Sequence, residues 1–336
     1  MTNNINLSVE LGKNKIKFSS CIYNASGPKC TNYHELDNIL NSKSCAVLSK
    51  SCTLEYREGN KGIRYWDSSS INNYENMYSI NSMGLPNNGY MYYINYLDKL
   101  YRENISKPYI ISVAGLSLQD NLKIIESINS KNGEQKKRYN TSSVVIGVEL
   151  NLSCPNIIGK GQLAYDFIQL ENYLNSIFEL DMTHIDIFGV KLPPYFELSY
   201  FESVANILKK FPIDFITCIN SVPNAMIIDL DIDKPVIEPK NGLGGLGGDI
   251  IKPISLSNVF NFKKLLPDFD IIGCGGVKTG ADAYEMILCG ASAVQIGTQY
   301  MIEGVDCFNR IENELMEIME KKGKKNIDEF KSSIIM

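Results

Sequence analysis

A short polar cluster ends one of the most apolar stretches of the chain. Residues 144–150 are rich in valine, isoleucine and leucine, which is typical of a strand covered on both faces in a parallel α/β sheet. Asn151-Leu-Ser-Cys-Pro-Asn156 follows, with the thiol of Cys154 between two amides and a proline that ends the strand. Two glycines, Gly159 and Gly161, could let the next loop close as a lid. We interpret this stretch as a strand that delivers chemistry at its C-terminal end, against the simpler interpretation of Cys154 as an inert buried thiol.

The composition favours an enzyme-sized domain that acts on small molecules. With 336 residues, 44% of them hydrophobic, the chain could form one α/β barrel with insertions or two ordinary domains, and we expect a single domain over residues 1–336. The net charge of −5 gives no reason to expect nucleic acid or an anionic membrane as a partner. The nine cysteines lack any Cys-x-x-Cys or disulfide-like spacing, so we expect neither a metal site nor an iron–sulfur cluster.

The N-terminal residues and the hydropathy pattern indicate the compartment. The first residues lack the features of a signal or transit peptide. No apolar run reaches the roughly 18 residues that a membrane span needs. We therefore expect a soluble cytoplasmic protein.

Eight strand-like segments alternate with helical ones, which is the order expected of a (β/α)8 (TIM) barrel. Helical patterns occupy residues 33–40, 90–101 and 201–210, and two more follow Gly280, the second ending at Gly323. The predicted strands are residues 46–49, 78–81, 109–113, 144–150, 187–191, 215–220, 271–273 and 293–296. The predicted fold class is therefore α/β, a (β/α)8 barrel with surface insertions.

Two segments exceed a minimal barrel. Residues 129–143 are polar, rich in Asn and Lys and without periodicity, which predicts a surface insertion just before the strand at 144–150. Residues 223–248 form a longer excursion, rich in Asp, Pro and Gly, after the sixth strand. We expect no linker, internal repeat or second domain.

The C-terminal ends of barrel strands form the active site, so the residues that follow each strand are of most interest. These residues include two lysines, three asparagines, two serines and a thiol: Lys50, Ser51, Asn81, Asn151, Cys154, Lys191, Asn220 and Ser221. So many polar groups around one cavity would be costly in an apolar core that offered them no partners. They suit a planar, anionic ligand that carries amide groups.

The seventh and eighth predicted strands end in glycine, at Gly273-Cys-Gly-Gly276 and Gly297-Thr298, each before a helix. Barrels commonly bind phosphate here, because glycine lets backbone N–H groups approach the oxygens and a helix N-terminus favours negative charge. The alternative is that the glycines only make turns. Since Lys50 and Lys191 are placed to meet a flavin or a similar ring, we favour a phosphate site.

Two other patterns are weaker. The run Gly242-Leu-Gly-Gly-Leu-Gly247 matches the dinucleotide fingerprint only formally, because Lys252-Pro253 interrupts the helix that this motif requires. We expect instead a loop of close approach, with Gly248 near the cofactor. The only two histidines are expected to be structural, because His34 lies in an early helix and His184 precedes the fifth strand; this argues against a hydrolase triad.

Ten short blocks, in order along nearly the whole chain, carry a resemblance to a known family. They are Asn24-Ala-Ser-Gly27, Lys50-Ser51, Arg57-Glu-Gly-Asn60, Arg64-Tyr65, Ser79-Ile-Asn-Ser-Met-Gly-Leu-Pro-Asn87, Asn151-Leu-Ser-Cys-Pro-Asn156, Gln162-Leu-Ala-Tyr-Asp166, Gly189-Val-Lys-Leu-Pro-Pro-Tyr-Phe196, Gly273-x-Gly-Gly276 and Gln295-Ile-Gly-Thr298. In this combination they resemble the class 1A dihydroorotate dehydrogenases, the soluble FMN enzymes of pyrimidine synthesis.

The resemblance implies a homodimeric barrel in which FMN lies across the strand ends and dihydroorotate stacks on its ring. Cys154 would be the base, and Lys50 and Lys191 the other catalytic residues. The residues implied to hold FMN are Ala25, Ser26, Lys50, Ser51, Asn81, Asn151, Lys191, Ile219, Gly248, Gly275, Gly276, Gly297 and Thr298. The residues implied to hold the substrate are Lys50, Asn81, Met83, Gly84, Leu85, Asn151, Asn156, Asn220 and Ser221.

The implied reaction accounts for these residue types. Oxidation of dihydroorotate to orotate removes a proton from C5 and a hydride from C6, and FMN accepts the hydride at N5. Cys154, a thiol with a reference pKa of about 8.5, would take the proton. Lys191 would stabilise negative charge on the reduced ring, and the asparagines would bind the imide edge and the carboxylate. Fumarate, reduced to succinate in the same pocket, would reoxidise the flavin.

The chain also departs from the family pattern. Cys52 and Cys274 stand where hydroxyl residues are expected, Thr217-Cys218 stands where the family tends to have Asn-Ser before Asn220, and residues 129–143 are longer than usual. None of these departures touches Cys154 or the two lysines, although Cys274 lies near the expected phosphate site.

Three alternatives remain beside class 1A. Class 1B enzymes pass electrons to NAD through an iron–sulfur flavoprotein subunit, and only the Arg57 and Arg64 blocks argue against them. Class 2 enzymes reduce quinone, use serine as the base and carry an N-terminal membrane segment, and neither feature is seen. From another class of function, the chain could be a flavin-binding barrel that has lost catalysis and serves as an interaction protein; the presence of Cys154 and both lysines argues against this.

Overall fold

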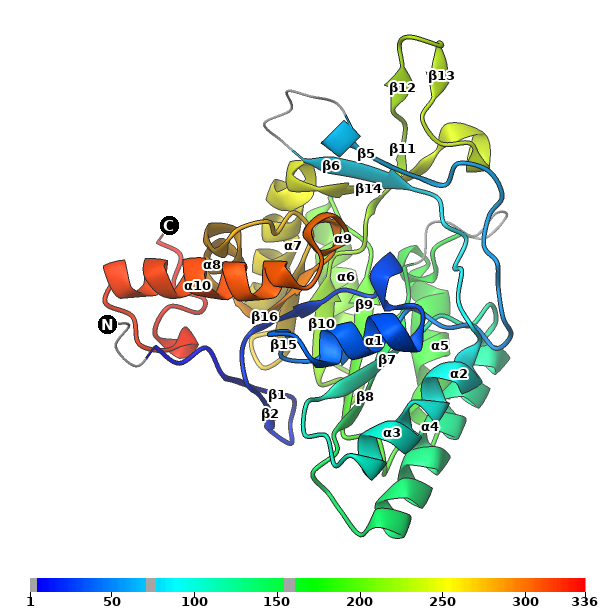
Figure 1. Ribbon diagram of the computed structural model, residues 1–336, viewed down its shortest axis with the longest axis vertical. Coiled ribbons are helices and arrows are strands. Elements are labelled where there is room, and N and C mark those ends of the chain that lie inside the picture. The colour runs from blue at the N-terminus through cyan, green and yellow to red at the C-terminus, as the bar shows by residue number, and fades with distance from the viewer. Residues whose placement is uncertain (1–4, 71–76, 154–160, 336) are drawn as a thin grey trace.

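The computed structural model describes residues 5–70, 77–153 and 161–335. Eight parallel strands form one sheet in the order β3-β16-β15-β10-β9-β8-β7-β4. Their bounds are β3 (Ile22–Asn24), β4 (Val47–Leu48), β7 (Tyr109–Val113), β8 (Ile146–Asn151), β9 (Ile187–Leu192), β10 (Phe215–Cys218), β15 (Asp270–Cys274) and β16 (Ala291–Ile296). Helices surround this sheet (Figure 1), so the predicted (β/α)8 fold class is confirmed.

A side chain completes the barrel between β3 and β4. The Cys45 N–H donates to the Ile22 carbonyl at 2.9 Å. Further along both strands, the side-chain amide of Asn24 is buried and contacts Leu48. Its oxygen accepts from the Leu48 N–H at 2.9 Å, and its NH₂ group donates to the Leu48 carbonyl at 2.7 Å. Asn24 thus supplies the hydrogen bonds that β4 would otherwise receive from a neighbouring strand.

The helical patterns predicted at 33–40, 90–101 and 201–210 are observed, with two differences in extent. The helix predicted at 33–40 is confirmed at both ends, and its N-terminus is fixed by a reciprocal capping box between Asn32 and Glu35. The pattern at 90–101 is divided at Tyr96 into two short helices, and the helix predicted at 201–210 begins and ends earlier. The observed helices are α1 (Tyr33–Leu40), α2 (Tyr90–Asn95), α3 (Leu97–Arg102), α4 (Leu118–Tyr139), α5 (Phe167–Phe178), α6 (Leu198–Leu208), α7 (Lys252–Leu265), α8 (Gly280–Leu288), α9 (Thr298–Glu303) and α10 (Asp306–Lys321).

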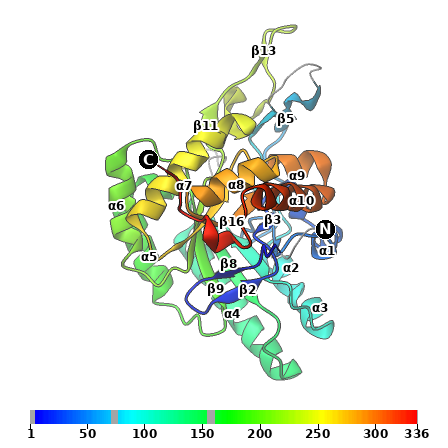
Figure 2. The ribbon, with the colours of Figure 1, turned by 90° about the vertical axis from the view of Figure 1, so that its left-hand side faces the viewer.

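One predicted barrel strand is wrong. β6 (Tyr78–Asn81) belongs to a separate antiparallel sheet of order β11-β14-β6-β5, with β5 (Tyr65–Asp67), β11 (Val222–Ala225) and β14 (Gly244–Gly248). This sheet, which we call the cover sheet, lies across the C-terminal end of the barrel (Figures 1 and 2). The missing barrel strand is β3, whose three residues gave too short a pattern to detect, whereas the local β pattern of 78–81 does not specify which sheet it joins.

The predicted surface insertion at 129–143 is also wrong over most of its length, because α4 continues to Tyr139. From residue 129 on, the buried side chains of α4 are amides: Asn129 accepts from the His184 N–H at 2.7 Å, and Asn132 donates to the His184 carbonyl at 2.5 Å. Buried amides in place of aliphatic side chains hide the helical periodicity. They also fix His184 beside α4, before β9, which is where the sequence predicted it.

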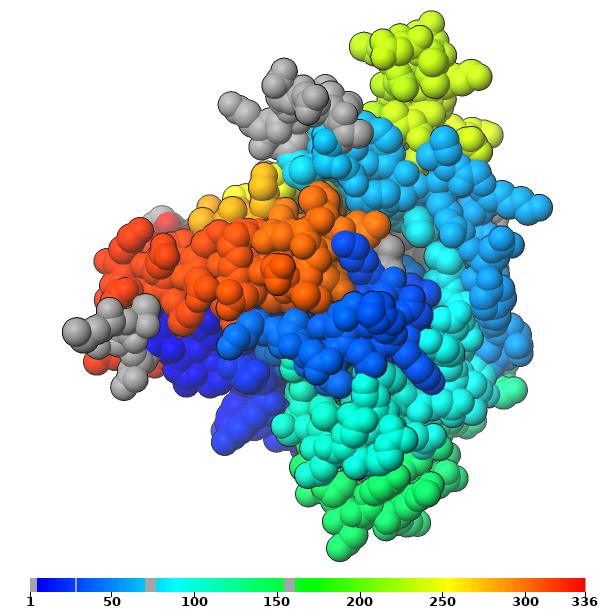
Figure 3. Space-filling model, viewed as in Figure 1, coloured from blue at the N-terminus to red at the C-terminus, as the bar shows by residue number. Residues whose placement is uncertain are grey.

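The excursion at 223–248 is confirmed. It contains β14 and nearly all of β11, two of the four strands of the cover sheet. Between β11 and β14 lies a hairpin, β12 (Ile228–Asp229) and β13 (Lys234–Pro235), that projects from the molecule (Figure 3). Short 3-10 helices complete the fold at η1 (Pro28–Cys30), η2 (Ser68–Ser70), η3 (Leu163–Tyr165), η4 (Pro239–Gly242), η5 (Asp249–Ile251) and η6 (Ile327–Glu329).

The opposite end of the barrel is covered by a hairpin of β1 (Val9–Leu11) and β2 (Ile16–Phe18), seen beneath the strands in Figure 2. Its Gly12 N–H donates to Asp270 at 2.8 Å, at the start of β15, and Phe18 is buried. The cavity described below therefore lies at the other end, under the cover sheet. Within the described ranges, no helix combines the length and hydropathy needed to cross a bilayer.

Candidate functional site

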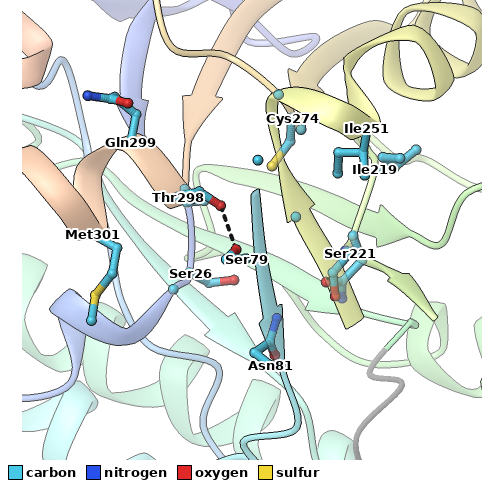
Figure 4. A pocket seen from close by; sticks show the side chains of 18 of the residues that line it. Ser26, Ser79, Asn81, Ile219, Ser221, Ile251, Cys274, Thr298, Gln299 and Met301 are labelled. Atoms are coloured by element: carbon cyan, nitrogen blue, oxygen red, sulfur yellow. Dashed lines mark hydrogen bonds between the residues drawn. The ribbon is translucent and has the colours of Figure 1, made fainter. Parts of the chain in front are cut away.

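A cavity lies between the C-terminal strand ends of the barrel and the cover sheet (Figure 4). The structure brings nearly the whole predicted set together around it. Every residue implied to hold FMN lines this cavity, namely Ala25, Ser26, Lys50, Ser51, Asn81, Asn151, Lys191, Ile219, Gly248, Gly275, Gly276, Gly297 and Thr298. Of the residues implied to hold the substrate, the lining includes Lys50, Asn81, Met83, Leu85, Asn151, Asn220 and Ser221.

Three predicted positions are not among the lining residues. Gly84 stands between Met83 and Leu85, which both line the cavity. Cys154 and Asn156 lie outside the described residues, as does Gly159 of the predicted lid. The role of Cys154 as base therefore stays a prediction from the sequence.

The amides at the rim are held in fixed orientations. Asn151, the last residue of β8, accepts hydrogen bonds from the N–H and the hydroxyl of Ser153, both at 3.1 Å. The Asn220 amide donates to the Ser153 hydroxyl at 3.0 Å and to the Ser153 carbonyl at 3.1 Å. Ser153 is fully buried and links the two asparagines, a role that the sequence analysis missed although Ser153 stands inside a quoted block.

Lys50 and Ser51 follow β4 and are both buried. The Lys50 ammonium lies 3.4 Å from the Ser26 carbonyl, so it bridges toward the loop after β3. Ser51 pairs with Ser112 at 2.8 Å and accepts from the Asn151 amide at 3.3 Å. These contacts connect the ends of β3, β4, β7 and β8 into one polar surface.

Lys191 forms the floor of the cavity from the inward side of β9. Its ammonium donates to the Gln295 side-chain carbonyl at 3.0 Å and lies 3.6 Å from the Cys274 sulfur. Burial alone would lower the pKa of Lys191, but the neighbouring Cys274 and the Glu149 carboxylate outweigh burial and raise it. Lys191 is therefore a buried cation that stays protonated at neutral pH.

The two unexpected cysteines differ in position. Cys274 lines the cavity, and burial raises the pKa of its thiol although Lys191 acts in the opposite direction. Cys52 is fully buried outside the lining, and burial raises its pKa to about 12. Both side chains are therefore neutral thiols at neutral pH, with little nucleophilic character.

The glycine loop after β15 has a backbone conformation that other residues rarely adopt. Gly275 and Gly276 have φ of 117° and 78°, and a Cβ at Gly276 would lie 2.5 Å from the Lys252 Cβ. These values explain the glycines as turn residues that bring the backbone close to α7. Both glycine loops line the cavity, one before α8 and the other at the start of α9. The phosphate site stays a prediction.

The cover sheet supplies the roof. Asn81 donates to the Gly245 carbonyl at 3.1 Å, and Ser79 pairs with Thr298 at 3.1 Å (Figure 4). Pairing of β6 with β14 brings Ser79 and Gly247 to the cavity together. The lining residues that the sequence analysis did not assign to the site are Gly27, Tyr65, Met77, Ser79, Gly247, Asp249, Ile251, Val277, Gln299 and Met301.

The formal dinucleotide fingerprint is confirmed as spurious. β14 pairs antiparallel with β6 and β11, so it is not the first strand of a parallel βαβ unit. The reason given from the sequence needs correction, because Lys252-Pro253 begins α7 rather than interrupting a helix. Gly247 and Gly248 nevertheless line the cavity.

Comparisons with known proteins agree with this site. A family model described as "Dihydroorotate dehydrogenase" matches residues 8–319. A dihydroorotate dehydrogenase (fumarate) of Lachancea kluyveri is 42% identical over 313 residues, which cover 93% of each chain. A protein of Streptococcus pyogenes serotype M1, provisionally named dihydroorotate dehydrogenase A (fumarate), is 42% identical over 94% of this chain and 95% of its own. The family predicted from the ten sequence blocks is confirmed.

Proposed function

Because the chain belongs to the dihydroorotate dehydrogenase family, we propose that it oxidises dihydroorotate to orotate in pyrimidine synthesis and reduces fumarate to succinate. We propose fumarate as the electron acceptor because the names of both relatives specify it. The observation that supports the proposal most directly is the cavity, where Lys50, Asn81, Asn151, Lys191 and Asn220 converge from separate elements.

The residues around the cavity fit FMN as the cofactor. Lys191 offers a buried cation, and Gly276 exposes its backbone to the cavity at a position where even a Cβ would crowd Lys252. Ala25, Ser26, Lys50, Ser51, Asn81, Asn151, Lys191, Ile219, Gly248, Gly275, Gly276, Gly297 and Thr298 would hold it. When bound, FMN accepts a hydride from the substrate and passes the electrons on.

The substrate would be held by charge and by fixed amides. Orotate and dihydroorotate carry a carboxylate and an imide edge, which match the Lys50 ammonium and the amides of Asn81, Asn151 and Asn220. Because Ser153 already fixes two of these amides, binding requires little reorganisation. Met83, Gly84, Leu85, Asn156 and Ser221 complete the proposed substrate site.

Cys154 is the proposed base. The residue before it is anchored, since the Ser153 hydroxyl lies 3.2 Å from the Lys191 carbonyl and its N–H donates to Asn151. The chain is therefore firmly positioned up to the residue before the thiol. A thiol at this strand end would take the C5 proton of dihydroorotate, while Lys191 offsets the negative charge that hydride transfer adds to the ring.

The proposed oxidant would use the same site. Fumarate is a planar dicarboxylate, so the groups that bind orotate can bind it, and the two half-reactions then alternate in ping-pong kinetics. Orotate is expected to compete with fumarate in steady-state assays of the purified protein. Non-competitive inhibition, or faster reduction of quinone or NAD when each replaces fumarate, would reject this acceptor while leaving dihydroorotate as the substrate.

The same assays separate the remaining alternatives. Rapid NAD reduction with an added iron–sulfur flavoprotein subunit would indicate a class 1B enzyme. Bound FMN without turnover of dihydroorotate would indicate a barrel that serves as an interaction protein. The proposal further includes a homodimer, as the sequence resemblance implies. It also includes a cytoplasmic location without nucleic-acid or membrane partners, as the N-terminal residues, the net charge and the hydropathy predict.

A further inference from the structure

Beneath Lys191, the interior of the barrel contains a chain of buried polar side chains. Glu149 from β8, Thr217 from β10, Gln295 from β16 and Tyr23 from β3 are all fully buried. One carboxylate oxygen of Glu149 accepts from the Gln295 amide at 2.6 Å and from the Thr217 hydroxyl at 2.7 Å. The Gln295 amide also lies 3.2 Å from the Tyr23 hydroxyl. No step of the proposed reaction uses Glu149 or Gln295.

The orientation of Gln295 follows from its two partners. An ammonium group only donates hydrogen bonds and a carboxylate only accepts them. The Gln295 carbonyl therefore faces Lys191 and its NH₂ group faces Glu149, at 3.0 and 2.6 Å. One amide thus links a buried cation to a buried anion, with its dipole aligned between the two charges.

The Glu149 carboxyl group is the acidic group that Gln295 links to this cation. The titratable groups that face Lys191 are Cys274 on β15, Cys30 on η1 and Glu149 on β8, with Cys218 on β10 and Tyr23 on β3 next to them. Burial raises the pKa of all three thiols and of the Tyr23 phenol, so these groups are neutral at neutral pH. A buried ammonium without a counter-charge would be costly.

We propose that Glu149 is a positioning residue, which acts through Gln295 to hold the Lys191 ammonium at the cavity floor and to keep it charged whether the flavin is oxidised or reduced. This inference rests on the proposed function, because it assumes that FMN lies over Lys191. It assigns a role to two residues that do not line the cavity themselves.

The consequence concerns protons. Without the Glu149 charge, the buried amine of Lys191 gives up its proton while the flavin is oxidised. Reduction adds negative charge next to Lys191, and the amine then takes up one proton from solvent. Reduction of the bound flavin therefore consumes one more proton per two electrons in such a variant than in the wild type.

The test compares FMN-loaded wild type with Glu149→Gln, Glu149→Asp and Thr217→Val. Each protein is reduced with dithionite in the presence of a reference redox dye, anaerobically, over a pH series around neutrality. For Glu149→Gln, the ratio of reduced to oxidised FMN at a fixed potential is expected to fall about tenfold more per pH unit than for the wild type, the value for one extra proton. Glu149→Asp keeps the carboxylate, and Thr217→Val removes only one hydrogen bond to it, so both are expected to keep the wild-type pH dependence.

Wild-type pH dependence in FMN-loaded Glu149→Gln would overturn the inference, and so would an equally steep dependence in Thr217→Val. If Glu149→Gln does not fold, Glu149→Ala removes the same charge without a new amide in its place, and the inference again requires a steeper dependence than the wild type. Wild type that binds no FMN would instead reject the proposed cofactor. If the wild type binds FMN and oxidises dihydroorotate but the variants keep the wild-type pH dependence, only the role of Glu149 is rejected.

Discussion

Cys154 is the residue on which the proposed chemistry depends most directly. Cys154→Ala is expected to retain FMN, because the proposed cofactor contacts lie on other residues, and to reduce flavin with dihydroorotate about 10²–10⁴-fold more slowly. Anaerobic stopped-flow measurement of flavin bleaching checks this. Cys154→Ser is the matched variant and should recover measurable activity only at high pH, since a hydroxyl is a far weaker acid than a thiol. Flavin reduction by Cys154→Ala at the wild-type rate would refute the assignment.

At the scale of residues, the sequence predicted the groups that face the ligand better than those that support them. Lys191 and Asn151 stand at strand ends, where chemistry is expected from the fold alone. Glu149 and Gln295 stand inside strands. The role of a polar residue there cannot be predicted until its neighbours across the barrel are known. Ser153 was hidden for the same reason, because its partners come from β9 and the segment after β10.

At the scale of elements, Asn24 completes the barrel with its side chain. Asn24→Ala is expected to lower the free energy of unfolding by about 2–4 kcal/mol, because the Leu48 N–H and carbonyl are left buried without this partner. Chemical denaturation of the variant measures this loss. Asn38→Ala, the same change at an exposed position of α1, is the control and should cost little. Equal stability of the two variants would contradict the role of Asn24.

The start of α8 gives a prediction about pH. Burial raises the pKa of Asp282, but hydrogen bonds from Lys252 and from the N–H groups of Lys278 and Thr279 outweigh it and lower the pKa. A carboxylate with a lowered pKa stabilises the fold above its unfolded pKa of about 3.9, and this stabilisation is lost as the pH falls through the folded value.

Asp282→Asn is therefore expected to cost about 1–2 kcal/mol at neutral pH and progressively less in acid, where wild-type Asp282 is itself protonated. Denaturation series at neutral and acidic pH measure the difference. Asp328→Asn removes an exposed carboxylate that pairs with Lys331 and serves as the control, with little effect at either pH. A cost that does not change with pH would show that the charge of Asp282 is unimportant.

The elements that the sequence predicted wrongly share a physical cause. β6 has a clear strand pattern, but only its pairing with β14 and β5 decides that it belongs to the cover sheet. α4 buries Asn129, Asn132 and Gln135, whose partners on other elements make them acceptable in the interior. In both cases tertiary contacts override a local pattern, whereas α1, whose capping box is local, forms over the predicted residues.

At the scale of the whole molecule, the proposed cofactor contacts join the barrel to its cover sheet. The protein is expected to purify yellow, and adding FMN to apo-protein should raise the melting temperature. Free FMN at 100 times its dissociation constant adds about 2.7 kcal/mol of stability. Differential scanning calorimetry measures the shift, with riboflavin, which lacks the phosphate, as the control ligand. A colourless protein that FMN neither binds nor stabilises would contradict the cofactor assignment.

The cover sheet also determines when during synthesis the site can exist. Asn81 meets Gly245 across 164 positions of the chain, and Ser79 meets Thr298 across 219. Contacts between segments so far apart form late in folding, because each must first close a long loop. A nascent chain translated to the end of β6 still lacks β11 and β14 of the cover sheet and both glycine loops. If FMN binds at the proposed site, it can bind only after the ribosome has translated past Thr298. The amount of flavin bound during cell-free synthesis then measures how many chains have completed the barrel.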